Sequence, residues 1–296
     1  MRANSVPRCS GQASDRGGAR PLLPHAVVVV IWVMADFMGT IESESERFLQ
    51  AVQIADPSAQ VPTCPDWTAE DLLWHLTEVH AYWAAILRER AQTEEESEAA
   101  EATKPQRPAD RDARVQLFRQ QTSALLAQLR ERDDSEPAWF WLETAKTVGS
   151  TLRMQAHEAT MHRVDAELTA GIESAPIDPE LAADGIAHGV QVMWGWWATL
   201  PGFVFRPVGG AVALTASDLD RTWHVQPGRW VGVGQSGTSY DEPGVVLTDR
   251  TEAVATVTGT AETLERWLWG RGPEPRCNGD QESLHALREA QKAGMQ

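Results

Sequence analysis

Apolar residues recur at helical spacing in four segments of the amino-terminal half, and each segment predicts an amphipathic helix. The segments span about 43–54, 68–90, 110–132 and 146–171. Polar connectors separate them, and long helices joined by connectors are typical of a bundle. We therefore predict a four-helix bundle.

Residues at the ends of these segments start and stop helices. Thr68 followed by Asp71 has the spacing of an amino-terminal capping pair, and Gly171 supplies a stop after the fourth helix. Between the first two helices, 61–67 is a connector stiffened by prolines. The acidic, proline-ended run 93–108 predicts a solvated loop.

Beyond about 175 the pattern changes to short apolar runs between turn residues, which is typical of strands. These runs are 211–216, 221–225, 229–234, 244–248 and 252–259. Helices are predicted at 179–199, 264–271 and 281–292. The fold class is therefore α+β, with a bundle over 38–175 and a smaller α+β domain over 176–296 that has a mainly antiparallel sheet.

Residues 1–37 stand apart from both domains. A stretch rich in Arg, Gly, Ser and Pro precedes the apolar run 26–34, which is shorter than the ~20 residues that span a bilayer. We expect an extension that is disordered or lies upstream of the native start, with Met34 or Met38 as a later start. A signal peptide and a lipid- or partner-binding arm are the alternatives.

The charge balance narrows the choice of partners. The 296 residues include 26 Lys and Arg against 42 Asp and Glu, a formal net charge of −16. Nucleic acids and anionic membranes bind basic surfaces, so neither is an expected partner, and no membrane span is predicted. Three widely separated cysteines do not form a disulfide framework, which favours a reducing, cytoplasmic setting.

The predicted fourth helix carries a stripe of polar residues. Residues four and seven apart share one face of a helix, so Glu158, His162 and Asp165 point the same way, whereas His157 points about 100° away. The stripe is completed by Thr151, Gln155 and Thr169. Apolar residues flank it on both sides, which favours an interior stripe over the alternative of a solvated face.

Glu158 and His162, one turn apart, could hold a metal ion from one rigid element. Carboxylate oxygen and imidazole nitrogen suit Zn²⁺, whose catalytic sites use about three protein ligands. His75, on the flank of the apolar stripe of the second helix, is the best third ligand, and a satisfied core histidine is the alternative. The reserve candidates are Glu78, His80, His157 and His188. A di-metal carboxylate site needs Glu-x-x-His on two helices, which the chain lacks.

Two further residues near these candidates have more than one interpretation. Asp165 could orient a ligand histidine through its second nitrogen or form an ordinary helix salt bridge. Cys64 lies between Pro62 and Pro65 without a neighbouring basic residue, and we interpret it as structural rather than as a ligand or nucleophile.

Four ordered blocks resemble the mycothiol-dependent maleylpyruvate isomerase family. VPTCPDWTAEDLLWHLTEVHAYW resembles that family's connector and second helix, and RMQAHEATMHRVDAELTAG resembles its fourth helix. PIDPELAADGI resembles its inter-domain helix, and VATVTGTAETLERWLWGR the end of its carboxy-terminal domain. The resemblance runs from about Met38 to about Gly272 and implies a DinB-like bundle. The aromatic run 193–202 departs from the family pattern, which leaves the role of the Trp194–Trp197 cluster open.

The resemblance also implies a site and a reaction. It places the metal ligands at His75, Glu158 and His162, and it implies Zn²⁺ or another divalent metal with mycothiol or a similar thiol as cofactors. The substrate would be a small electrophile, such as a carboxylate. A thiolate favoured by the metal would add to a cis double bond, and rotation and loss of the thiol would give the trans isomer; a transferase would stop at the adduct.

Arg271, which closes WLWGR, is the candidate for a catalytic contact with an anion, and an ordinary charge near the carboxyl end of a helix is the alternative. Two other functions fit the same residues: a non-catalytic module that binds a small ligand, and a hydrolase that uses zinc-bound water. The sequence does not indicate an oligomeric state.

Overall fold

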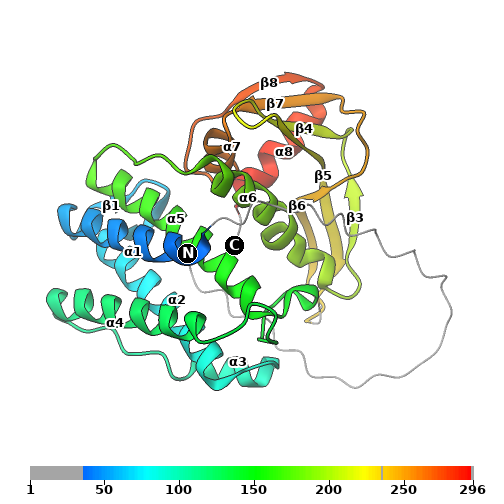
Figure 1. Ribbon diagram of the computed structural model, residues 1–296. Helices are drawn as coiled ribbons and strands as arrows, with labels where there is room; N and C mark the ends of the chain where they lie inside the picture. Colours follow the sequence, from blue (N-terminus) through cyan, green and yellow to red (C-terminus); the bar gives the residue numbers. More distant parts are fainter. Residues whose placement is uncertain (1–35, 235, 295–296) are drawn as a thin grey trace, which may run out of the picture.

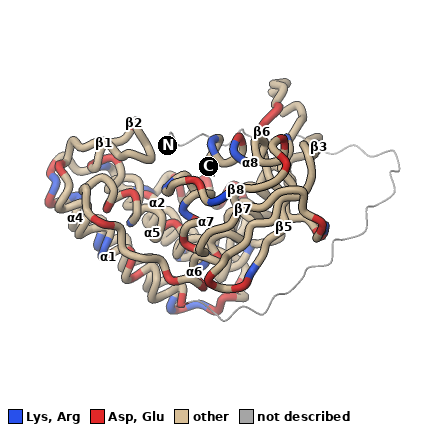
Figure 2. The backbone as a smooth tube through the Cα atoms, turned by 90° about the horizontal axis from the view of Figure 1, so that it is seen from above, with Lys and Arg blue, Asp and Glu red and all other residues tan. Residues whose placement is uncertain are grey.

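The computed structural model describes residues 36–234 and 236–294. A helical part lies beside a part built on a sheet, and both views show this arrangement (Figures 1 and 2). Helix α6 (Pro179–His188) lies between the two parts (Figure 1). The predicted α+β class is confirmed. The predicted extension falls outside the described residues up to Ala35, and the first helix begins at Phe37.

The helical part contains the four long helices that the apolar pattern predicts. They are α1 (Phe37–Ile54), α2 (Ala69–Glu89), α4 (Arg111–Arg130) and α5 (Val148–Ala170). The predicted capping pair is present at the start of α2, where Thr68 and Asp71 bond to each other's backbone N–H. Gly171 ends α5 in the left-handed conformation.

Helices α2 and α5 run in opposite directions. Leu72 and Leu76, near the start of α2, share a core cluster with Ala166 near the end of α5. Trp83, near the end of α2, shares a second cluster with Leu152 near the start of α5. A step toward the carboxyl end of α2 is therefore a step toward the amino end of α5.

The connector 93–108 is not the loop that its acidic composition predicts. Helix α3 (Glu94–Glu101) forms within it. Thr93 accepts a hydrogen bond from the backbone N–H of Glu96, whose carboxylate accepts one from the N–H of Thr93. This capping box and the acidic first turn, which the helix dipole favours, outweigh the charge repulsion between the glutamates.

A two-stranded hairpin forms within the proline-stiffened connector between α1 and α2. Strands β1 (Gln60–Val61) and β2 (Cys64–Thr68) pair antiparallel. A short 3₁₀ helix, η1 (Glu143–Ala145), precedes α5.

The sheet contains six strands among the described residues, in the order β3-β5-β4-β7-β8, with β6 also paired to β5. The strands are β3 (Val204–Pro207), β4 (Val212–Ala216), β5 (Arg221–Val233), β6 (Ser239–Leu247), β7 (Ala255–Gly259) and β8 (Arg276–Gly279). Only β4 and β7 pair in parallel, so the mainly antiparallel sheet is confirmed for this part of the chain.

Strand β5 corrects the prediction of two strands broken near Pro227 and Gly228. The backbone stays extended there because β4 pairs with its first half, β3 with its second half, and β6 with both. Strands β3 and β8 were not predicted; each has only four residues and one partner strand.

The predicted helix 179–199 is also only partly correct. Helix α6 continues as a π-helix, η2 (Gly189–Met193), and then as a 3₁₀ helix, η3 (Trp194–Thr199). Trp196 and Trp197 pack edge to face, and Trp197 also lies against Phe203. The last helices are α7 (Ala261–Leu268) and α8 (Gln281–Ala293).

Helix α5 belongs to the cores of both parts. Leu152 and Ala156 pack within the bundle, whereas Met161 and Val164 join the core of the sheet-containing part. Acidic and basic residues are distributed along both parts (Figure 2). None of the described helices combines the length and the apolar composition that crossing a membrane requires.

Candidate metal centre

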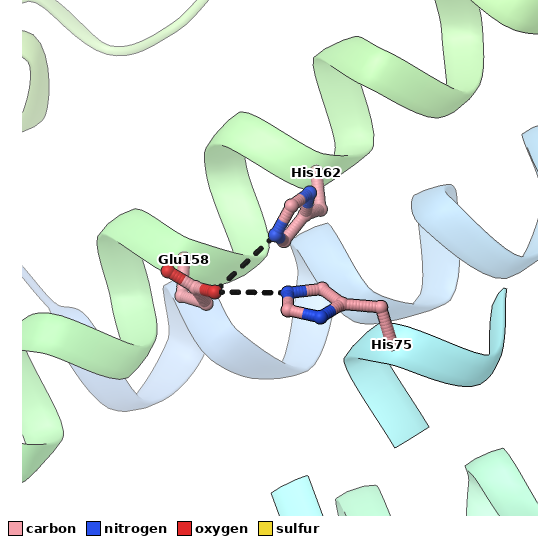
Figure 3. Close-up of side chains that lie close together, drawn as sticks. All are labelled: His75, Glu158 and His162. Carbon is pink, nitrogen blue, oxygen red and sulfur yellow. Dashed lines mark hydrogen bonds and ion pairs between the residues drawn. The ribbon is translucent and has the colours of Figure 1, made fainter. Parts of the chain in front are cut away.

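Three side chains from two helices converge inside the bundle. His75 comes from α2, and Glu158 and His162 come from α5 (Figure 3). Glu158 Oε1 lies 3.2 Å from His162 Nε2 and 3.5 Å from His75 Nε2. The three candidate ligand atoms all lie within 4.8 Å of one another. The structure thus brings together all three residues that the sequence singled out as ligands.

The helices themselves explain this convergence. Glu158 and His162 are one turn apart, so they project side by side from α5. The antiparallel α2 then presents His75 to the same point. His75 and Glu158 keep 24% and 19% of their side-chain surface exposed, whereas His162 keeps 3%. His162 is therefore buried, whereas His75 and Glu158 each keep part of the side chain exposed; the Nε2 atom of His75 is itself buried.

The donor atoms fit a divalent metal ion. Two imidazole nitrogens and one carboxylate oxygen form a ligand set of zinc enzymes, which leave one position for water or substrate. Among the residues that the structure describes, no other group of His, Cys, Asp and Glu side chains meets the same spacing.

Asp165 holds His162 from the other side. Its Oδ2 lies 3.0 Å from His162 Nδ1. Arg271 donates to both carboxylate oxygens, at 3.1 and 2.9 Å, and Thr63 Oγ1 donates to Oδ1 at 2.5 Å. Asp165 thereby holds the His162 ring with Nε2 toward Glu158, the arrangement in which an outer carboxylate orients a ligand histidine.

Asp165 contacts His162, as the first interpretation requires, and its cationic partner comes from another element rather than from its own helix. It bonds to His162 within α5 and forms an ion pair with Arg271 from beyond α7. Thr63 was not predicted, since a threonine in a connector carries no pattern that points to a partner about a hundred positions away. Trp67, also missed, lies with its ring 4.7 Å from the His75 ring.

The electrostatics of the cluster follow from these contacts. Burial opposes the charge on His162, but the hydrogen bonds to Asp165 and Glu158 raise its pKa to about 9. Burial lowers the pKa of His75. Burial also opposes ionisation of Glu158, yet its hydrogen bonds to His162 and His75 hold its pKa well below the usual value. Arg271 and His162 do the same for the buried Asp165. Both carboxyl groups are therefore ionised at neutral pH.

Comparison with known proteins gives the same assignment for both parts of the chain. The profile of the mycothiol maleylpyruvate isomerase N-terminal domain matches residues 39–167, and that of the family's C-terminal domain matches residues 180–285. The chain belongs to the mycothiol maleylpyruvate isomerase family. The predicted resemblance is thereby confirmed, and with it the prediction of an enzyme family.

Solved structures of the mycothiol-dependent maleylpyruvate isomerase share the fold. One aligns with a TM-score of 0.50 at 15% identity and covers 83% of this chain and 94% of its own. A mutant of that enzyme, in which a histidine is replaced by alanine, aligns with the same TM-score and identity, covering 81% and 95%. A search of curated proteins found no match.

The reserve ligands of this family member lie elsewhere. His157 bonds to Asp184 of α6, and the ring of His188 stacks on the ring of His157. His80 bonds to Thr122 of α4, and Glu78 lies near Lys104. None of these reserves belongs to the three-residue cluster.

Arg271 and Cys64 lie at the edge of the same cluster. Arg271 is buried, and besides its bonds to Asp165 it donates to the backbone carbonyl of Trp269. Arg271 thus contacts both a carbonyl at the end of α7, as a cation near the carboxyl end of a helix does, and the carboxylate beside His162. Burial and the charge of Asp165 raise the pKa of the half-buried Cys64 thiol. Cys64 thus lacks the thiolate character of a nucleophile.

Proposed function

We propose that this family member is a zinc-dependent enzyme that uses a low-molecular-weight thiol, mycothiol or a similar one, to isomerise or conjugate a small electrophile. His75, Glu158 and His162 would hold Zn²⁺ or another divalent metal. The observation that carries the proposal is that three zinc-type donor atoms, one from each side chain, lie within 4.8 Å of one another. Two of these side chains, His75 and Glu158, stay partly exposed.

When bound, the metal would favour the deprotonated form of a thiol at neutral pH. The residues of the chain contribute position and charge. Glu158 and His162 are fixed by one helix, and Asp165 holds His162 with Nε2 toward the other donors. Thiol and substrate would approach from the side on which the His75 and Glu158 side chains are partly exposed.

Arg271 would serve the site through Asp165. Its Nε and Nη2 are bonded to that carboxylate and its Nη1 to the carbonyl of Trp269. The buried ion pair would keep Asp165 ionised and in place behind His162. A direct contact between Arg271 and a substrate carboxylate remains a prediction. The guanidinium would have to make that contact in addition to its bonds to Asp165 and Trp269.

The family supports the reaction class. The solved enzymes with this fold are described as mycothiol-dependent maleylpyruvate isomerase. For this chain the proposal therefore includes addition of a thiolate to an activated double bond, followed by bond rotation and loss of the thiol. Conjugation would be the same first step without the last.

The first test is the metal content of the purified full-length protein, measured by plasma mass spectrometry. We expect about one zinc per chain, lost in His75→Ala and in His162→Ala. His285→Ala is the matched control, because His285 is on α8 and largely exposed, and it should keep the metal. A folded wild type that takes up no divalent metal when zinc is offered would contradict the proposal and leave a small-ligand-binding module.

The second test is thiol dependence. The zinc-loaded protein is assayed with a cis-configured enone acid, with and without an added thiol. We expect turnover only with the thiol. Undiminished turnover without any thiol would instead indicate a hydrolase or lyase that activates water, in which case the metal part of the proposal would stand and the thiol part would fail.

A further inference from the structure

Three fully buried polar side chains lie in the bundle interior next to the metal centre. They are His80 of α2 and Thr151 and Gln155 of α5. We call them the inner polar group. Thr151 and Gln155 continue the stripe of Glu158 and His162 toward the amino end of α5.

The direction of the helices places His80 at a depth between those of Gln155 and Thr151. His80 lies five residues beyond His75, about 7.5 Å along α2. Because α5 is antiparallel to α2, moving in the same direction along α5 leads from Glu158 toward its amino end. Gln155 and Thr151 lie about 4.5 and 10.5 Å from Glu158 along that axis. His80 also falls in the interior stripe of α2, with Leu76 and Trp83.

The hydrogen bond to Thr122 fixes the tautomer of His80. The Thr122 hydroxyl donates its one hydrogen to the carbonyl of Phe118, at 2.9 Å. Its oxygen can therefore only accept from His80 Nδ1, at 2.9 Å, so the proton of the neutral ring is on Nδ1. His80 Nε2 then carries a lone pair, and it stays an acceptor because burial lowers the pKa of this histidine to about 3.

In the described part of the chain, the inner polar group contains two unused acceptors, His80 Nε2 and Gln155 Oε1, and one unused hydroxyl, that of Thr151, which can donate or accept. Within residues 36–234 and 236–294, His80 Nε2, Gln155 Oε1 and Thr151 Oγ1 have no hydrogen-bond partner. The Gln155 amide nitrogen reaches only the sulfur of Met154, at 3.2 Å. Other buried threonines of these helices are satisfied: Thr160 bonds to the carbonyl of Ala156 and Thr77 to that of Leu73.

Leaving such atoms unpaired in the interior is costly, and groups of this kind pair with a ligand or with ordered water. An imidazole lone pair and an amide oxygen repel carboxylates and phosphates but accept from O–H and N–H. We propose that the inner polar group binds an uncharged donor, a hydroxyl or an amide N–H, on the arm of the thiol that the metal centre holds. This inference rests on the proposed function and assigns the neutral part of the thiol to the bundle interior.

Two thiols that differ in one donor test it: N-acetylcysteamine, which has an amide N–H, and 2-mercaptoethyl acetate, which has an ester oxygen in its place. Binding to the cobalt-loaded full-length protein is followed by the sulfur-to-cobalt absorption band. We expect the amide to bind about three- to tenfold more tightly than the ester, the range of one net hydrogen bond.

The variants His80→Phe and Gln155→Leu should each reduce this preference toward one. His80→Phe leaves no donor unpaired, because Thr122 still donates to Phe118. Thr160→Val is the matched control, since its hydroxyl is already bonded within α5, and it should keep the preference. The thermal unfolding midpoint of the thiol-free protein should stay equal or rise in His80→Phe and Gln155→Leu, because a buried unpaired group is removed.

The opposite results are distinct. Equal binding of amide and ester to wild type would overturn the inference and leave the proposed function standing. A lower unfolding midpoint with an unchanged preference would also overturn it, by showing that the group serves structural water only. If neither thiol produces the cobalt band, the proposed function and this inference both fail.

Discussion

The two faces of α5 carry similar chemistry and differ in how it is enclosed. On the face toward the bundle, His162 lies between Glu158 and Asp165. On the face toward the sheet-containing part, His157 lies between Asp184 and Glu265, with Nε2 2.8 Å from Asp184 Oδ2 and Nδ1 3.6 Å from Glu265 Oε1. Each histidine thus has two carboxylates as neighbours.

The surroundings separate the two clusters. Arg153 bonds to Asp184, and the His188 ring packs 5.0 Å from His157. His157 and Glu265 have no exposed side-chain surface, whereas Glu158 and its partner His75 remain accessible. The cluster around His157 is closed by α6 and α7 and has a neighbouring aromatic ring where a metal site would need an open position. Side-chain type therefore does not distinguish a candidate site from an inter-domain contact; access and the elements that supply the partners do.

The sharpest way to break this comparison is to remove each histidine in turn. His162→Ala should lower metal affinity by more than the roughly 10–100-fold that loss of an outer partner of a ligand costs. His157→Ala should leave metal affinity near wild type and lower the free energy of unfolding, because Asp184 and Glu265 lose a buried partner. Competition with a chelator and urea unfolding measure the two effects.

An equal loss of metal in both variants would mean that the two faces form one cooperative site, and the distinction drawn here would be wrong. Retention of metal in His162→Ala would move the candidate centre away from α5.

The two aspartates give the next comparison. Asp165→Asn keeps the shape of the side chain but leaves Arg271 buried without a counter-charge, and we expect a loss of ~3 kcal/mol in unfolding free energy together with about 10–100-fold weaker metal binding. Asp184→Asn should destabilise the protein through Arg153 and His157 and leave metal affinity unchanged. Metal-binding titrations on the two variants separate them; equal affinities would show that Asp165 does not orient His162.

A substitution at Gly185 tests the closed face alone. A Cβ atom at this position would lie 1.8 Å from Glu265 Oε1 and 3.1 Å from His157 Nδ1. Gly185→Ala therefore forces Glu265 to move inside a packed interface, and we expect a loss of about 1–3 kcal/mol in thermal or urea unfolding. Metal content should not change. Wild-type stability in this variant would mean that the interface has room that the contacts do not suggest.

The sequence predicted the open face better than the closed one for a physical reason. Glu158 and His162 share a helix, so their spacing alone places them together, and His75 lies on a strongly periodic helix. The resemblance to the family supplied the same three residues. His157 was recognised as pointing away from the stripe, but its partners Asp184 and Glu265 belong to other helices, and no local period relates residues that only tertiary packing brings together.

The same limit explains the errors in the fold. The sequence contains Thr93 and Glu96, which form the capping box of α3, but the acidic composition around them led to the prediction of a loop. The Pro227–Gly228 pair has the local signature of a turn, and only pairing with three other strands keeps β5 extended. Local preference failed where tertiary pairing decided the outcome.

The smallest expected effect comes from the charge of Glu265. Burial raises the pKa of this carboxyl from its ordinary value of 4.5 to about 7. The folded protein thus holds a proton that the unfolded chain has released, so this contribution to stability is fully present below pH 4.5 and is lost as the pH rises through about 7. Burial opposes the charge on His157, but Asp184 and Glu265 raise its pKa, which adds a dependence of the same sign.

Glu265→Gln keeps the shape of the side chain and removes its titration, so wild type should lose about 1–3 kcal/mol of unfolding free energy relative to the variant between pH 5 and pH 8. Urea unfolding of the metal-free proteins at both pH values measures the difference, and the groups around His162, common to both proteins, cancel. Parallel pH profiles would show that Glu265 is ionised throughout and is a charged member of the ion-pair network of Arg153, Asp184 and His157.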